Sequence, residues 1–136
     1  MKIKISRDSV CLADDINENS RIYQLDDNET YEELFTILKD DNFFPSVSGN
    51  NVVWVMTTGQ YECVFSYFTK TNKFSMGLSE KHIIKICDYP YEAHLKYYSS
   101  PAKWKKKIYA MYNEDEYALW RDGWTNELNN CDETIK

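Results

Sequence analysis

The sequence predicts an α+β protein in which an antiparallel sheet is packed by one central helix and by C-terminal helices. Three observations support this class: apolar residues alternate near the N-terminus and again over 52–78, a capped amphipathic helix begins near residue 30, and helical periodicity returns after residue 100. The chain has 136 residues, of which 43% are apolar, so we expect a single domain covering residues 1–136.

The first strands of the sheet are expected near the N-terminus. Lys2–Ser6 alternates lysine and isoleucine, which places Ile3 and Ile5 on one face of a strand. A polar turn follows, and Val10–Ala13 is expected to return as the second strand of a hairpin. Arg21–Leu25 is expected to form a further strand.

The central helix has the clearest local signals. Thr30 and Glu33 have the spacing of a capping box, in which each side chain bonds the backbone amide of the other residue. Apolar residues then follow at helical spacing, and the helix is expected to end around residues 39–41. The residues of this apolar face are Tyr31, Leu34, Phe35 and Leu38.

A three-stranded meander is expected in the middle of the chain. Val52–Thr57 is rich in β-branched and aromatic residues, as expected of a strand covered on both faces. Tyr61–Thr69 and Phe74–Leu78 follow after short polar turns. Together these three segments and the N-terminal hairpin would make the antiparallel sheet.

The last third of the chain is expected to be mainly helical. Tyr91–Tyr98 is interpreted as one or two helical turns. Ser100 and Pro101 suit an N-cap and a first helical residue, opening a helix that continues through Tyr112. A second helix is expected from Asn113, and residues 129–136 are expected to fray.

Composition and the cysteines limit the possible functions. The formal net charge of −6 argues against a general nucleic-acid binder, which needs cationic surface against phosphates. The chain shows neither an export signal nor an apolar run long enough to span a membrane, so we expect a cytoplasmic protein with no membrane contact. The four cysteines are at least 24 positions apart, so we expect free, mostly buried thiols and no metal or other cofactor. They are Cys11, Cys63, Cys87 and Cys131.

Charge is distributed unevenly along the chain. Residues 8–41 hold eleven acids against Arg21 and Lys39, whereas residues 101–112 hold four lysines and no acid. One interpretation of the acidic stretch is a solvated surface; the other is a docking surface for a cationic protein. The docking hypothesis assigns the charge to Asp26, Asp27, Glu29, Glu32, Glu33, Asp40 and Asp41.

The aromatic residues are also segregated. All six phenylalanines precede residue 75, whereas the stretch from Tyr89 to Trp124 holds seven tyrosines and three tryptophans. Tyrosine and tryptophan are enriched at protein interfaces, although they also pack under the rim of small domains. The candidate anchors for a partner are Tyr97, Tyr98, Tyr109, Tyr112 and Trp120.

Catalysis is the second hypothesis. The chain lacks a glycine-rich phosphate loop, a nucleophile elbow and a metalloprotease motif. A small hydrolase or transferase would therefore use Cys87 with His82 and His94, or paired carboxylates. A third alternative is a structural or oligomerising module whose aromatic surface mediates self-association.

One segment carries a family resemblance. The run Phe44-Pro-Ser-Val-Ser-Gly-Asn-Asn-Val-Val-Trp-Val55, followed by a turn and an aromatic strand, resembles a segment of small uncharacterised bacterial proteins. The likeness covers roughly residues 40–70 and transfers no functional residue. Size, acidity and the lack of catalytic motifs also resemble immunity proteins of bacterial toxin systems. This resemblance implies a non-enzymatic binding protein that occludes a cationic partner, with self-association as a further option.

Overall fold

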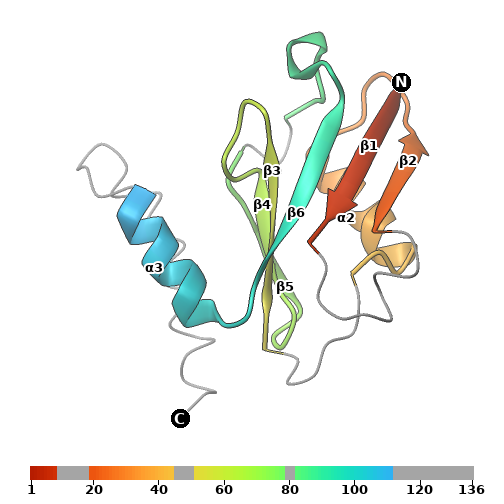
Figure 1. Cartoon of the computed structure of the whole chain (residues 1–136). Helices are drawn as coiled ribbons and strands as arrows, with labels where there is room; N and C mark the ends of the chain where they lie inside the picture. The colour runs from red at the N-terminus through yellow and green to blue at the C-terminus, as the bar shows by residue number, and fades with distance from the viewer. Residues whose placement is uncertain (9–18, 45–50, 79–81, 112–136) are drawn as a thin grey trace.

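The computed structural model describes residues 1–8, 19–44, 51–78 and 82–111. Within these ranges the chain forms a six-stranded sheet with a helix on each face, which confirms the α+β class (Figure 1). The elements are β1 (Lys2–Arg7), β2 (Ser20–Gln24), α2 (Tyr31–Asp40), β3 (Val53–Thr58), β4 (Phe65–Phe68), β5 (Lys73–Met76), the 3-10 turn η1 (Ile86–Asp88), β6 (Glu92–Tyr98) and α3 (Pro101–Met111).

The sheet is mixed, so the expectation of an antiparallel sheet is wrong for one pair of strands. The strand order is β2-β1-β6-β3-β4-β5. β1 and β6 run parallel, with Lys4 beside Glu92 and Arg7 beside Leu95, and every other neighbouring pair is antiparallel. Parallel strands need a long connection, and here most of the described chain separates the two. No local turn signal could therefore reveal the pair.

β6 also corrects the expectation of helical turns over Tyr91–Tyr98. It is a strand of seven residues in the middle of the sheet, between β1 and β3. Ala93 and Leu95 are buried on one face, whereas His94 and Lys96 point to the other. This period of two is the strand pattern.

The other strands follow the sequence more closely. β2, β3, β4 and β5 lie within or next to the segments expected for them, and β3, β4 and β5 form the expected meander. β1 pairs antiparallel with β2, with Ile3 beside Tyr23. The return strand expected at Val10–Ala13, the helix from Asn113 and the tail 129–136 lie outside the described residues.

α2 confirms the helix expected from the capping box. The amide of Glu33 donates to Thr30 Oγ1 at 3.1 Å, and the amide of Thr30 donates to Glu33 Oε2 at 3.5 Å. The apolar face of α2 packs on the sheet with Trp54 and Phe65 to form the main core. Its four buried residues are Tyr31, Leu34, Phe35 and Leu38.

α3 covers part of the opposite face of the sheet. It begins as expected after Ser100, whose Oγ accepts from the amide of Lys103 at 3.3 Å. Trp104 and Ile108 are each 1% exposed and pack against β3 and β4 in a second, smaller core. On the same face Lys4 of β1 is exposed, so this part of the sheet is open to solvent.

Candidate functional site

The loop formed by residues 82–91 lies beside the N-terminal end of α2. The amide of Ile84 donates to the carbonyl oxygen of Glu29 at 2.9 Å, and Ile83 forms an isolated β-bridge with Thr30. Figure 1 shows this loop and the start of β1 at the same end of the sheet. The loop therefore brings residues from distant parts of the sequence next to the acidic N-terminal end of the helix.

Hydrogen bonds hold this loop in place. Asp88 is buried, and its Oδ2 accepts from the amide of Lys85 at 2.9 Å. The carbonyl oxygen of Tyr91 accepts from the amide of Lys4 at 2.9 Å, which ties the end of the loop to β1. The side-chain amide of Gln60 also donates to the carbonyl oxygen of Cys87.

Three large apolar side chains of this anchored loop face solvent. Ile83 is 38% exposed, Ile86 is 84% exposed and Tyr89 is 72% exposed. The ring of Tyr89 meets that of Tyr91 edge to face, with centroids 5.7 Å apart. Clustered apolar side chains left in water are typical of interaction sites.

Carboxylates lie at the start of α2 and in the turn before it, where the loop contacts Glu29 and Thr30. Asp26 and Asp27 are exposed in the turn before α2, and Asp27 lies 3.7 Å from the N-terminal ammonium group. A side-chain hydrogen bond with Glu33 raises the pKa of Glu29, with burial as the second cause. We call these seven residues the acidic–apolar surface: Asp26, Asp27, Glu29, Glu33, Ile83, Ile86 and Tyr89.

The remaining predicted acids are placed differently. Glu32 is half-buried in the first turn of α2. Asp40 and Asp41 lie at the other end of this ten-residue helix, about 15 Å away along its axis. Asp41 Oδ2 accepts from Arg21 Nη1 at 2.6 Å and from the Tyr23 hydroxyl at 2.7 Å. The seven predicted acids therefore do not form one surface.

The predicted aromatic anchors do not share one face either. Tyr97 packs against Trp54 on the α2 side of the sheet, with centroids 5.3 Å apart. Tyr98 packs against Trp104 on the α3 side, with centroids 5.0 Å apart. Neighbouring strand residues point to opposite faces, so the two tyrosines are separated. The side chain of Tyr109, and Tyr112 and Trp120, lie outside the described part of the chain.

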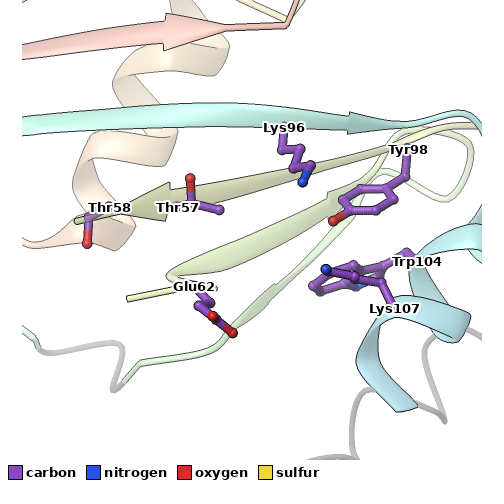
Figure 2. A pocket seen from close by; sticks show the side chains of 7 residues that line it. All are labelled: Thr57, Thr58, Glu62, Lys96, Tyr98, Trp104 and Lys107. Carbon is purple, nitrogen blue, oxygen red and sulfur yellow. The ribbon is translucent and has the colours of Figure 1, made fainter. Parts of the chain in front are cut away.

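A groove runs between α3 and the sheet. It encloses about 190 Å³, and Figure 2 shows Lys96 and Tyr98 from β6 on one side with Trp104 and Lys107 from α3 on the other. Thr57 and Thr58 of β3 and Glu62 complete the lining. Tyr98 is thus half-buried beside this groove.

The structure does not bring together the predicted trio of Cys87, His82 and His94. The His82 ring stacks on that of Tyr31, with centroids 5.9 Å apart, on the α2 side of the sheet. Cys87 is exposed, and its sulfur lies 3.9 Å from Asp88 Oδ1. His94 points to the opposite face, because Ala93 and Leu95 beside it face α2.

Cys63 is the other cysteine that the structure describes. Cys63 is buried, and the loss of solvation raises the pKa of its thiol. Both described cysteines are free, as expected, but the expectation that such thiols are mostly buried holds for Cys63 and not for Cys87; Cys11 and Cys131 are not among the described residues. In the described ranges, no three His, Cys, Asp or Glu side chains are grouped as ligands for a metal ion.

Sequence reasoning missed the apolar half of the acidic–apolar surface. The run from Ile83 to Tyr89 contains three isoleucines, which is an available signal. However, Ile84 is 2% exposed while Ile83 and Ile86 face solvent, and this difference depends on which side of the loop meets α2 and β1.

Comparisons with known proteins give no further identification. Neither a scan against protein-family models nor searches of curated proteins and of solved structures gave a match to this chain. Among the described helices, none has the length and apolar character needed to cross a membrane.

Proposed function

We propose that this protein binds a protein partner with a cationic surface, in the manner of an inhibitor or immunity protein, through the acidic–apolar surface. The observation that carries the proposal is the anchored loop, which bonds to Glu29 at the start of α2 and leaves Ile86 and Tyr89 exposed. Protein interfaces combine an apolar centre, which supplies most of the affinity, with a polar rim.

The carboxylates favour a cationic partner. Glu29 and Glu33 lie close enough to share a hydrogen bond, which raises the pKa of Glu29. A lysine or arginine placed between them would relieve their repulsion and favour the ionised form of both. Charges at the rim of an interface mainly accelerate association, and salt weakens this effect.

The loop is suited to present the apolar centre. The bonds of Asp88, Tyr91 and Ile84 hold its backbone before any partner arrives. A preorganised loop loses little conformational entropy on binding, so more of the contact energy appears as affinity. We therefore expect Ile86 and Tyr89 to be the residues whose loss weakens the complex most.

Affinity capture from the native host with wild-type and variant baits tests this proposal. The captured protein is then purified, and its association and dissociation rates are measured as a function of salt. Ile86→Ser is expected to weaken binding by about tenfold or more, mainly through faster dissociation. Glu29→Gln with Glu33→Gln is expected to slow association and to flatten its salt dependence.

Asp40→Asn is the matched control. It removes an exposed acid from the opposite end of α2, so it changes the net charge without touching the acidic–apolar surface. Binding that responds equally to Asp40→Asn and to Glu29→Gln would contradict the assignment of the surface. An acidic partner, or association independent of salt, would contradict the electrostatic part. Sedimentation that shows self-association lost in Ile86→Ser would favour the oligomerising alternative.

A further inference from the structure

Ser6, His94 and Asp8 form a continuous hydrogen-bonded chain on the α3 side of the sheet. The parallel register of β1 and β6 places Ser6 beside His94. Ser6 Oγ lies 2.8 Å from His94 Nδ1, and His94 Nε2 lies 2.6 Å from Asp8 Oδ1. The imidazole therefore bridges a hydroxyl group and a carboxylate.

The partners of the imidazole define its proton positions. The carboxylate of Asp8 accepts a hydrogen bond, so the proton of neutral His94 resides on Nε2. Nδ1 is then left as the acceptor for the Ser6 hydroxyl. The second oxygen of Asp8 accepts from the backbone amide of Tyr97 at 2.8 Å, which fixes the carboxylate. A nucleophile bonded to a base, with the base oriented by a third group, is the arrangement that activates serine.

The three hydrogen-bonded side chains of Ser6, His94 and Asp8 are accessible to small molecules. The side chains of His94 and Asp8 are 40% and 38% exposed. Ser6 and His94 line a depression of about 210 Å³ that also borders Thr57 and Thr58. The same two threonines line the groove that contains Lys96, Lys107 and Glu62, so the depression and the groove are neighbours (Figure 2).

We propose that Ser6 is the nucleophile of an acyl-transfer site that hydrolyses small esters. His94 is the general base and acid, and Asp8 is a positioning residue. The depression is large enough for a small ester. Glu92 and Lys96 lie two residues before and after His94 on the same face of β6, so a carboxylate and an ammonium group flank the site.

The reaction needs only the ester and water. Ser6 Oγ bonds to the carbonyl carbon while its proton passes to His94 Nδ1, and Asp8 stabilises the imidazolium ion. The bond to the leaving oxygen breaks, and that oxygen takes the proton from His94, which leaves an acyl ester on Ser6. Water then attacks this ester, passing a proton to His94. His94 returns the proton to Ser6 Oγ as the acyl group leaves as a carboxylic acid.

This site is independent of the acidic–apolar surface. Ser6 and His94 face α3, whereas Glu29 and Ile83 lie at the N-terminal end of α2 on the other side of the sheet. Loss of one activity therefore does not imply loss of the other.

A fluorophosphonate probe with mass-spectrometric mapping provides the first test. We expect wild-type protein to carry the probe on Ser6, and His94→Gln to slow labelling by about 100-fold or more. Asp8→Asn is expected to slow labelling and to change its pH profile, because the carboxylate orients His94 and stabilises the imidazolium ion that forms during the reaction. Ser75→Ala, which removes another serine from the same face of the sheet, is the matched control and should leave labelling unchanged.

Hydrolysis of p-nitrophenyl acetate provides the second test. Ser6→Ala should abolish the acylated intermediate. If Ser6→Ala fails to fold, Ser6→Cys keeps a nucleophile of similar size, and alkylation of the introduced thiol should slow when His94→Gln is added. The proposal would be overturned if Ser6 were not labelled, or if the rates of labelling and alkylation did not change in His94→Gln. The hydrogen bonds of Ser6, His94 and Asp8 would then only connect β1 to β6.

Discussion

Gly77 lies where any side chain would collide with backbone. A Cβ atom added there would stand 2.3 Å from the carbonyl oxygen of Cys63 and 3.2 Å from its sulfur. The amide of Gly77 also donates to the carbonyl oxygen of Val64 at 2.8 Å, so the segment cannot move away freely. We predict that Gly77→Ala lowers the free energy of unfolding by about 1–3 kcal/mol, measured by urea denaturation.

Gly59 is the control for this prediction. A Cβ atom added at Gly59 would meet nothing within 4 Å. We expect Gly59→Ala to change the free energy of unfolding by less than about 0.5 kcal/mol. Equal losses in the two variants would show that the crowding at Gly77 is not what destabilises it.

Asp41 gives a prediction for acid stability. The hydrogen bond from Tyr23 lowers the pKa of Asp41, and the guanidinium group of Arg21 lowers it further. A depressed carboxyl pKa stabilises the folded state above the ordinary value of 3.8, and this stabilisation is lost as pH falls through the lower folded value. When the pH is lowered from neutral to below 3.8, the melting temperature of the Asp41→Asn variant should therefore fall by less than that of the wild-type protein.

The size of this effect is small because the pair is exposed. The side chains of Arg21 and Asp41 are 35% and 47% exposed, so solvent screens their attraction. We expect Asp41→Asn to cost less than about 1 kcal/mol at neutral pH. Asp40→Asn, which changes the adjacent exposed carboxylate, is the control, and an equal response to acid in both variants would contradict the role of Arg21 and Tyr23.

Among the elements, α2 depends on its N-terminal cap. Thr30 and Glu33 satisfy each other's amides, which have no partner within the helix. We predict that Thr30→Ala lowers the free energy of unfolding by about 1 kcal/mol, measured by chemical denaturation. Thr36→Ala is the control, since Thr36 is exposed in the middle of α2 and its hydroxyl bonds only the carbonyl oxygen of Glu32 among the described contacts. Alanine has the higher helix propensity, so a loss in Thr36→Ala as large as in Thr30→Ala would contradict the capping argument.

The contrast between α2 and β6 explains what the sequence could predict. α2 is specified by residues within one short segment, from the cap at Thr30 to the apolar face that ends at Leu38. β6 is specified by its neighbours β1 and β3, and β1 is far away in the sequence, since Ser6 and its partner His94 are 88 positions apart. The alternation of Ala93 and Leu95 with polar residues was visible, but tyrosines on both sides obscured its period.

The same distinction applies to the candidate sites. The acids around Glu29 could be found from composition, whereas the exposure of Ile86 depends on how its loop meets α2 and β1. Ser6 and Asp8 are 88 and 86 positions from His94, so no spacing rule connects them. Only the parallel pairing of β1 and β6, which sequence reasoning did not foresee, creates that hydrogen-bonded chain.

At the scale of the whole molecule, the sheet separates two kinds of surface. Its α2 side carries the main core and, at one end, the acidic–apolar surface. Its α3 side carries a smaller core, and the remaining area is open and holds Lys4, Lys96 and His94. The net charge of −6 is therefore not spread evenly over the two sides of the sheet.

The buried tyrosines predict how the whole molecule responds to alkali. Burial is the main cause that raises the pKa of five tyrosines above the ordinary value of 10.0. These five tyrosines are Tyr23, Tyr31, Tyr61, Tyr67 and Tyr98. The pKa of Tyr23 is raised to about 12. The unfolded chain releases these protons near pH 10, whereas the folded chain retains them, so the unfolded state binds fewer protons above that pH. The stability that the protonated tyrosines contribute is therefore fully present below pH 10. It is lost as the pH rises through the raised pKa values of the folded state.

We predict cooperative unfolding above pH 10, in which tyrosinate absorbance rises together with the loss of the circular dichroism signal. Tyr98→Phe removes one half-buried phenol and should move the midpoint to higher pH. Tyr89→Phe removes a phenol that is 72% exposed and should leave the midpoint in place. If the absorbance of all the tyrosines rose near pH 10 while the dichroism signal persisted, the phenols would not be shielded by the fold. Such a result would contradict the packing of Tyr98 on Trp104 and of Tyr67 in the main core.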